Sequence, residues 1–268
     1  MVAASLVPAT ALLVPGAAGR AEVLVDLRVQ ALDAVSALLA AGPERVVVVA
    51  PGPTGRDLDG AVRASLASAG VPDGRLAWSL PPELQASHLA RVGVPTAGVP
   101  ASVGLLLLAR SGWVGPVRVL EVGPRDTAAI AAETTDRGAI LRALGSRLVD
   151  TGAGAGGSRV GVLVVGSLSA RHGPDAPLAD DERAPAYDAA VLADLADGST
   201  EARKRLGNLD EGVAGELAVT GWGPWQVLLG AVGDDAVDVV VLAASAPFGA
   251  QHVVATWLPR PVEAGEGP

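Results

Sequence analysis

The chain of 268 residues contains no cysteine. It therefore has no disulfide, thiolate nucleophile, Cys-ligated zinc or iron–sulfur cluster, and we expect a cytoplasmic location. Aromatic residues are also scarce, at 3% of the chain, with five Trp, one Tyr and one Phe. We therefore expect a core of Ala, Val and Leu, and the scarcity of aromatic residues argues against a base-stacking or aromatic-cage surface.

Acidic residues outnumber basic ones, so the chain carries no excess positive charge to attract a polyanion. The 20 Lys and Arg residues face 29 acidic ones, giving a net charge of −9, so we expect no nucleic-acid or anionic-membrane partner. The apolar run at residues 103–109 is far shorter than the roughly 20 residues of a membrane span. The apolar N-terminus lacks a basic region and is interrupted by Pro8 and Pro15, which favours a buried first strand and a turn over a signal peptide.

Several short runs are fully apolar and rich in valine, as expected of strands buried on both faces of a parallel sheet. They are residues 45–50, 117–122, 159–166 and 237–244. Helical spacing alternates with these runs, at residues 27–41, 57–69, 101–110, 126–150, 187–196 and 201–218, and from Pro224. This alternation predicts an α/β protein, a single-domain three-layer α/β/α sandwich with a central, mainly parallel or mixed sheet. We assign residues 1–260 to this domain and residues 261–268 to a flexible C-terminal tail.

The glycine-rich tract at residues 150–159 follows a predicted helix and precedes a strand. A dinucleotide-binding loop has the opposite order, because its glycines lead into a helix whose N-terminus meets the phosphates. The tract is therefore predicted to be a connector. A sugar- or nucleotide-binding domain stays open as an alternative, supported by fold analogy alone.

The three histidines are widely spaced, and none has a helical metal-ligand pattern with another histidine or carboxylate. His88 is predicted to be a surface residue and His252 a structural strand residue. His172 is the best catalytic candidate because it lies in a turn after a buried strand, although a solvated loop histidine beside Asp175 and Arg171 is the alternative.

Two serines in the same turn, Ser167 and Ser169, are candidate pocket residues. As nucleophiles they receive little support, because the turn lacks the second glycine of a Gly-x-Ser-x-Gly hydrolase elbow.

Four segments in order resemble the class III extradiol ring-cleavage dioxygenase superfamily, in the B-subunit-like group that also contains the Memo-like proteins. They are "PATALLVPGAAG" (8–19), "VVGSLSARHGPDAP" (164–177), "GPWQVLLGAV" (223–232) and "ASAPFGAQHVVATW" (244–257). The resemblance covers nearly the whole chain. It implies an α/β/α fold and, in active relatives, ferrous iron held by two His and a carboxylate, with a further histidine as acid or base.

The positions that carry this chemistry in the family differ here. Ala9 stands where the resemblance places the first iron ligand, and residues 95–104 contain no histidine for the second. Ala170 replaces the acid–base histidine, and Ser245 stands at the carboxylate position. We therefore expect no metal and no cofactor.

Two hypotheses follow. The first is a catalytically degenerate member that keeps the fold and a pocket for a small aromatic or polar ligand or a partner. The second is an enzyme with relocated chemistry, in which His172 and His252 meet at the old cavity with Asp175 or Asp188. A homo-oligomer also stays open, because Trp113, Trp222 and Trp225 lie near predicted loops, where they either form an exposed patch or pack in the core.

Overall fold

A seven-stranded mixed sheet forms the centre of the computed structural model, which describes residues 1–76, 78, 93–124, 136–150 and 158–260. The strand order is β3-β4-β2-β5-β1-β7-β6. The four central strands, β4, β2, β5 and β1, are parallel, whereas β3, β7 and β6 pair antiparallel at the two sides. The strands are β1 (Ala3–Val7), β2 (Arg45–Pro51), β3 (Arg56–Asp59), β4 (Val117–Val122), β5 (Val160–Val165), β6 (Val237–Ser245) and β7 (His252–Pro259).

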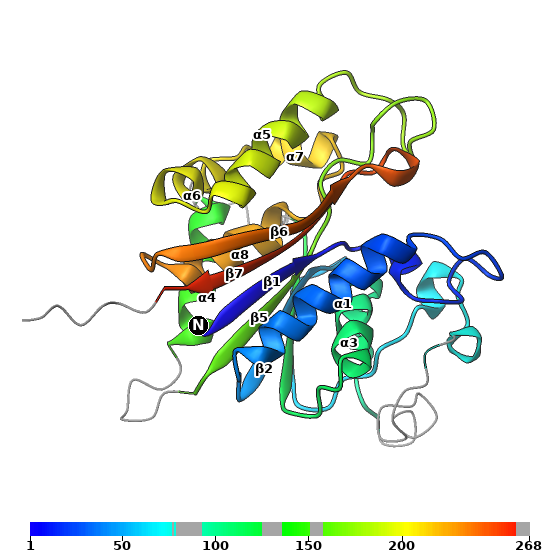
Figure 1. Cartoon of the computed structure of the whole chain (residues 1–268), viewed down its shortest axis with the longest axis horizontal. Helices are drawn as coiled ribbons and strands as arrows, with labels where there is room; N and C mark the ends of the chain where they lie inside the picture. The colour runs from blue at the N-terminus through cyan, green and yellow to red at the C-terminus, as the bar shows by residue number, and fades with distance from the viewer. Residues whose placement is uncertain (77, 79–92, 125–135, 151–157, 261–268) are drawn as a thin grey trace, which may run out of the picture.

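Helices cover both faces of the sheet (Figure 1). One face carries α1 (Val25–Ala40) and α3 (Val99–Arg110). The other carries α4 (Arg137–Val149), α5 (Ala184–Asp197), α6 (Thr200–Gly207), α7 (Glu211–Glu216) and α8 (Trp222–Val232). Short 3-10 turns lie at Ala11–Leu13, Ala67–Ala69, Asp73–Arg75 and Pro247–Gly249. The α/β fold with a mixed, centrally parallel sheet is therefore confirmed.

The valine-rich runs explain why the sheet is buried on both faces. Successive side chains of a strand point to opposite faces, so an all-apolar strand supplies both cores. In β2, Val46 and Val48 enter the core under α1 and α3, whereas Val47 and Val49 enter the core under α4 and α8. The predicted strands at residues 45–50, 117–122 and 159–166 are buried as expected.

Glycines allow α4 and α8 to pack closely. A Cβ atom on Gly230 would overlap the carbonyl oxygen of Arg142, and one on Gly145 would overlap that of Val227. Ser146 joins the two helices by donating from Oγ to the carbonyl oxygen of Gly230 at 2.9 Å. Backbone contact at these two positions brings α8 against the sheet and so sets where its N-terminus lies.

Two sequence predictions are wrong. The run at 237–244 was expected in a doubly buried strand, but β6 is an edge strand, and the side chains of Val240 and Val241 are exposed because only β7 pairs with it. The helix expected at 57–69 is replaced at its start by β3, which pairs with β4. Gly60 then adopts φ +85°, which ends the strand in a turn and is incompatible with a helix.

Several further features bear on the sequence predictions. Residues 1–23 begin with β1 and a turn, as expected. Trp222 and Trp225 are buried, so these two side chains pack in the core. Within the described ranges, no helix is both long and apolar enough to span a bilayer. His88, the centre of the glycine-rich tract and the 261–268 tail lie outside the described residues.

Candidate functional site

The carboxyl ends of β1 and β5 mark a point of divergence, because these adjacent parallel strands lead to opposite faces of the sheet. After β1 the chain enters α1 on one face, and after β5 it enters α5 on the other. Such a divergence is the place where open α/β sheets bind ligands. Ala9 follows β1 and Ser167 follows β5, and the two residues meet here, with the backbone N–H of Ala9 donating to Ser167 Oγ at 3.1 Å.

His252 completes a hydrogen-bonded cluster around Ser167. Its Nδ1 lies 3.0 Å from Ser167 Oγ, and the residue is only 5% exposed. Burial lowers the pKa of His252 from 6.5 to about 4, so its imidazole is neutral at neutral pH. Ser167 Oγ therefore joins the two residues, accepting from the backbone N–H of Ala9 and forming a hydrogen bond with Nδ1 of His252. We call Ala9, Ser167 and His252 the Ser167 cluster.

A second cluster forms around the buried carboxylate of Asp188, which is 1% exposed. Ser169 donates to it twice, from Oγ to Oδ2 at 2.5 Å and from the backbone N–H to Oδ1 at 3.1 Å. His172 Nε2 lies 2.7 Å from Oδ2, and its side chain is 19% exposed. We call Ser169, His172 and Asp188 the Asp188 cluster. An imidazole oriented by a buried carboxylate is an arrangement used for acid–base chemistry.

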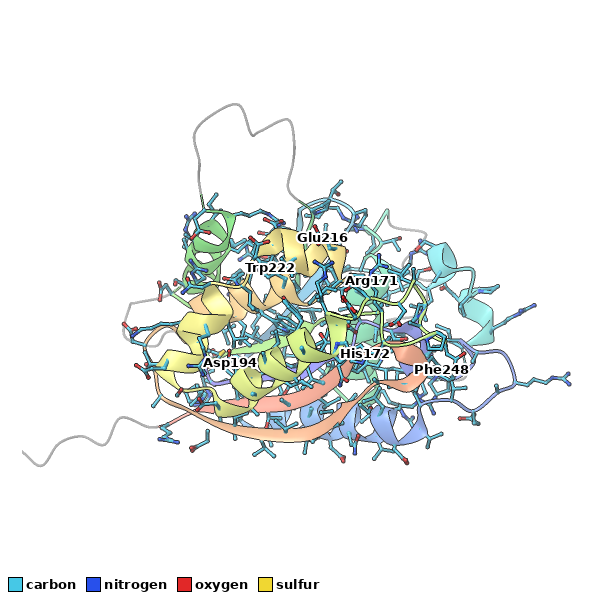
Figure 2. All side chains as sticks on the ribbon, turned by 90° about the horizontal axis from the view of Figure 1, so that it is seen from above. Arg171, His172, Asp194, Glu216, Trp222 and Phe248 are labelled. Carbon is cyan, nitrogen blue, oxygen red and sulfur yellow. The ribbon has the colours of Figure 1, made fainter. Side chains whose placement is uncertain are left out.

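The turn that carries the only phenylalanine packs against the Asp188 cluster. The backbone N–H of His172 donates to the carbonyl oxygen of Gly249 at 2.9 Å, and Figure 2 shows His172 beside Phe248. Phe248 adopts φ 54° and ψ 31°, a left-handed conformation that strains a bulky residue, and it is 57% exposed. The strain is held in place by the neighbouring backbone pairs between residues 168–172 and 249–251.

The remaining candidate positions lie outside both clusters. Ala170 presents only a methyl group, and its backbone pairs with Leu217 and Leu178. Asp175 is exposed in the turn, and Ser245 is exposed opposite His252 in the β6–β7 ladder. Thus His172 meets Asp188, the carboxylate named with it as an alternative, whereas His252 pairs with a serine. The two histidines have different partners.

A cavity of about 260 Å³ adjoins the Ser167 cluster. Its lining includes the carboxyl ends of β2 and β4, from which the chain continues to β3 at the sheet edge and to α4 on one face of the sheet. Thr220 links it to the cluster, because this residue lines the cavity and its Oγ1 accepts from the backbone N–H of Ser167 at 2.9 Å. We call this space, bounded by Pro51, Gly123, Arg137, Glu211, Thr220 and Trp222, the switch-point cavity.

Besides Thr220 in the turn before α8, three helices contribute Arg137, Glu211 and Trp222 to the switch-point cavity. The guanidinium of Arg137 lies 5.4 Å from the centroid of the Trp222 ring, as in a cation–π contact. Arg137 also pairs with Glu211 and donates to the carbonyl oxygen of Gly123. Gly223 has no room for a side chain, because a Cβ atom there would lie 2.7 Å from Val122 Cγ1. The cavity therefore combines an aromatic wall, a cation and close-packed backbone.

No motif or spacing in the sequence identifies these cavity residues. Arg137 and Glu211 are 74 positions apart and lie on predicted helices, where charged residues are ordinarily solvated. Trp222 was considered only as a surface or core residue. Thr220 belongs to no motif, and only the fold places it, in the turn between α7 and α8, where it accepts from the backbone N–H of Ser167.

The described residues do not fit a ferrous ion. A facial iron site needs two imidazoles and a carboxylate around one point. Ala9 and Ala170 supply methyl groups at two of the positions implied by the family resemblance. Across the described ranges, no group of three His, Cys, Asp or Glu side chains could hold a metal.

Comparison with known proteins relates the chain to a solved structure. No protein-family description matches the sequence, and no curated protein matches it. The fold is similar to the crystal structure of the uncharacterized protein JW3007 from Escherichia coli K12, with a TM-score of 0.51 and 13% sequence identity. The match covers 96% of this chain and 100% of that one. At this identity the likeness shows a shared fold.

Proposed function

We propose that this chain is a member of the class III extradiol dioxygenase superfamily that binds a small molecule without using ferrous iron. The observation that carries the proposal is the Ser167 cluster. At the strand end where the family resemblance implies an iron ligand, Ala9 offers a backbone N–H to Ser167, which in turn holds His252. Where the family resemblance implies an iron ligand, this chain therefore has hydrogen bonds between its own residues.

The switch-point cavity supports a small-molecule ligand. Its volume of about 260 Å³ lies just below the ~300–1,000 Å³ range of ligand pockets, which suits a compound no larger than a single ring. The Trp222 ring supplies an aromatic wall, and the guanidinium of Arg137 lies beside it in an ion pair with Glu211 that an anionic ligand would share. We therefore propose a small aromatic or polar ligand, and an aromatic carboxylate is the simplest probe of both walls.

Iron binding tests the first part of the proposal. The purified protein is incubated anaerobically with ferrous ion, desalted and assayed for iron and for catechol ring opening by absorbance. We expect iron far below one per chain and no ring opening. One iron per chain together with ring-opening activity would refute the proposal.

Ligand binding tests the second part. Benzoate is titrated against the protein, and tryptophan fluorescence is followed. We expect saturation in wild type and a severalfold weaker affinity in Arg137→Gln, because the cation is lost. Arg147→Gln, an exposed position on the same helix, is the matched control and should bind as wild type does. Equal weakening in both variants would argue against binding in the switch-point cavity.

A second candidate function rests on the Asp188 cluster. The 2.7 Å contact between His172 and the buried Asp188 carboxylate would orient an acid–base catalyst. In that case His172→Ala would lower turnover of a probe ester such as p-nitrophenyl acetate by about 100-fold or more, whereas Arg171→Ala would not. Unchanged turnover and ligand binding in His172→Ala would eliminate this candidate.

A further inference from the structure

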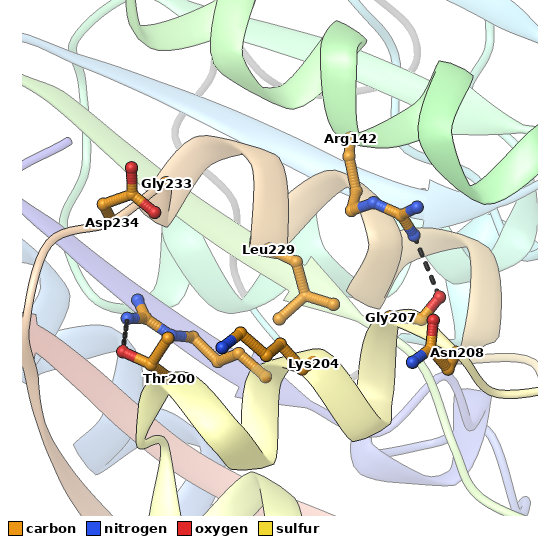
Figure 3. Close-up of a pocket in the computed structure, with 9 residues that line it drawn as sticks. Arg142, Thr200, Lys204, Gly207, Asn208, Leu229, Gly233 and Asp234 are labelled. Carbon is orange, nitrogen blue, oxygen red and sulfur yellow. Dashed lines mark hydrogen bonds between the residues drawn. The ribbon is translucent and has the colours of Figure 1, made fainter.

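A second cavity lies at the opposite end of α8 from the switch-point cavity. Its volume is about 280 Å³, and it is bounded by α4, α6 and the end of α8. Three of its nine lining residues are basic, in a chain whose net charge is −9. We call the space lined by Arg142, Thr200, Arg203, Lys204, Asn208 and Asp234 the basic cavity. Figure 3 shows Arg142 and Lys204 on two sides of it, with Leu229 between them.

Arg203 is the residue that points to a ligand. It is only 8% exposed, yet within the described ranges no carboxylate forms an ion pair with it. Its guanidinium donates to the carbonyl oxygen of Asp235 at 2.7 Å and to Thr200 Oγ1 at 3.4 Å, which uses two of its five N–H donors. A buried charge without a counter-charge is unfavourable, so an anion in the cavity would stabilise it.

The other two basic residues have weak or solvated partners. Lys204 lies 3.7 Å from Glu201, and both side chains are about 70% exposed, so this pair contributes little and leaves the ammonium free to turn to a ligand. Arg142 is ion-paired at 3.1 Å with Asp136, whose side chain is 66% exposed. It also donates to the carbonyl oxygen of Gly207 at 3.0 Å and to Gln226, which fixes its guanidinium at the cavity wall. Asp234 is the one acidic residue among the residues that line the cavity.

We propose that the basic cavity binds a small phosphorylated molecule through its phosphate group. A phosphate carries between one and two negative charges at neutral pH and accepts several hydrogen bonds. It therefore matches the uncompensated charge of Arg203 and the weakly paired charge of Lys204. Arginine forks are suited to phosphate oxygens, and lysine adds a point charge.

Calorimetric titration with inorganic phosphate at low salt tests this site, with succinate as a carboxylate probe. We expect phosphate to saturate one site and to bind more tightly than succinate. Lys204→Gln should weaken binding by about two- to fivefold, as expected for an exposed charge. Asp234→Asn should tighten it, because it removes the negative charge beside the anion. Arg205→Gln, on the same helix but paired with Asp194 at 2.6 Å outside the cavity, should leave it unchanged.

Arg203→Gln should abolish binding, with the circular dichroism spectrum as the check on folding. The Asp234→Asn variant keeps the test decisive if Arg203→Gln does not fold, since tighter binding cannot come from loss of structure. The proposal is overturned if phosphate does not saturate the wild type, if Lys204→Gln and Arg205→Gln weaken binding equally, or if succinate binds as tightly as phosphate.

Discussion

The buried His252 makes the stability of this protein sensitive to mild acid. Its pKa is about 4 in the folded chain and 6.5 in ordinary solvent, because burial disfavours the imidazolium. The unfolded chain therefore binds a proton between these two values that the folded chain does not bind. The stabilisation is fully present above pH 6.5 and is lost as the pH falls through this window.

The size of the effect follows from the width of the window. Each pH unit is worth about 1.4 kcal/mol per proton, so a fall from pH 7.5 to 4.5 crosses about two units of the window and costs about 2.5 kcal/mol. Carboxylates elsewhere also respond to acid, so the measured quantity is the difference between wild type and His252→Gln. Glutamine keeps an amide at Ser167 and cannot titrate.

Urea unfolding at the two pH values measures this difference. We expect wild type to lose about 2.5 kcal/mol more than His252→Gln between pH 7.5 and 4.5. Since His252→Gln lowers stability at both pH values, the comparison uses the change with pH and not the absolute free energy. Equal losses in the two proteins would refute the assignment of His252 as a buried neutral imidazole.

Three further predictions concern the supporting structure. Asp188→Asn should cost about 2–4 kcal/mol in urea unfolding, because Ser169 and His172 lose charge-assisted hydrogen bonds; a loss below ~0.5 kcal/mol would contradict this. Gly230→Ala should cost about 3 kcal/mol or more, because its Cβ overlaps the backbone of α4, whereas Gly215→Ala, with open space around it, should be neutral or stabilising. Thr220→Val should cost about 1–2 kcal/mol by leaving the Ser167 N–H without its acceptor, as thermal unfolding can measure.

The sheet could be predicted because its signal is local. The valines of β2, β4 and β5 form short, mainly apolar runs, and the helical segments between them favour parallel pairing. The same signal misled at residues 237–244, since an apolar run does not reveal whether a strand has one neighbour or two. The helix predicted at residues 57–69 is wrong because residues 56–59 pair with β4 and Gly60 turns the chain at φ +85°, a tertiary contact and a backbone conformation that local spacing does not reveal.

The candidate site could be predicted in position but not in its contacts. Ser167, Ser169 and His172 follow a buried strand, so the sequence predicts that they lie at the carboxyl end of that strand. Their partners come from remote segments: Asp188 from α5 and His252 from the start of β7. Nothing in the spacing of these residues indicates that Ser167 would hold one histidine and Asp188 the other.

The polar groups that already have partners within the protein can be distinguished from those that lack a counter-charge, and this difference separates structural from ligand-binding roles. In the Ser167 and Asp188 clusters, the hydroxyl groups and the carboxylate have partners supplied by the protein, so these groups are stable without a ligand. Arg203 is different, because its buried charge has backbone and hydroxyl partners but no counter-charge in the described structure. A ligand that displaced the cluster contacts would lose as many hydrogen bonds as it gained, whereas an anion beside Arg203 would gain without displacement. By this criterion an anion is expected in the basic cavity, and the two clusters serve to fix the strand ends.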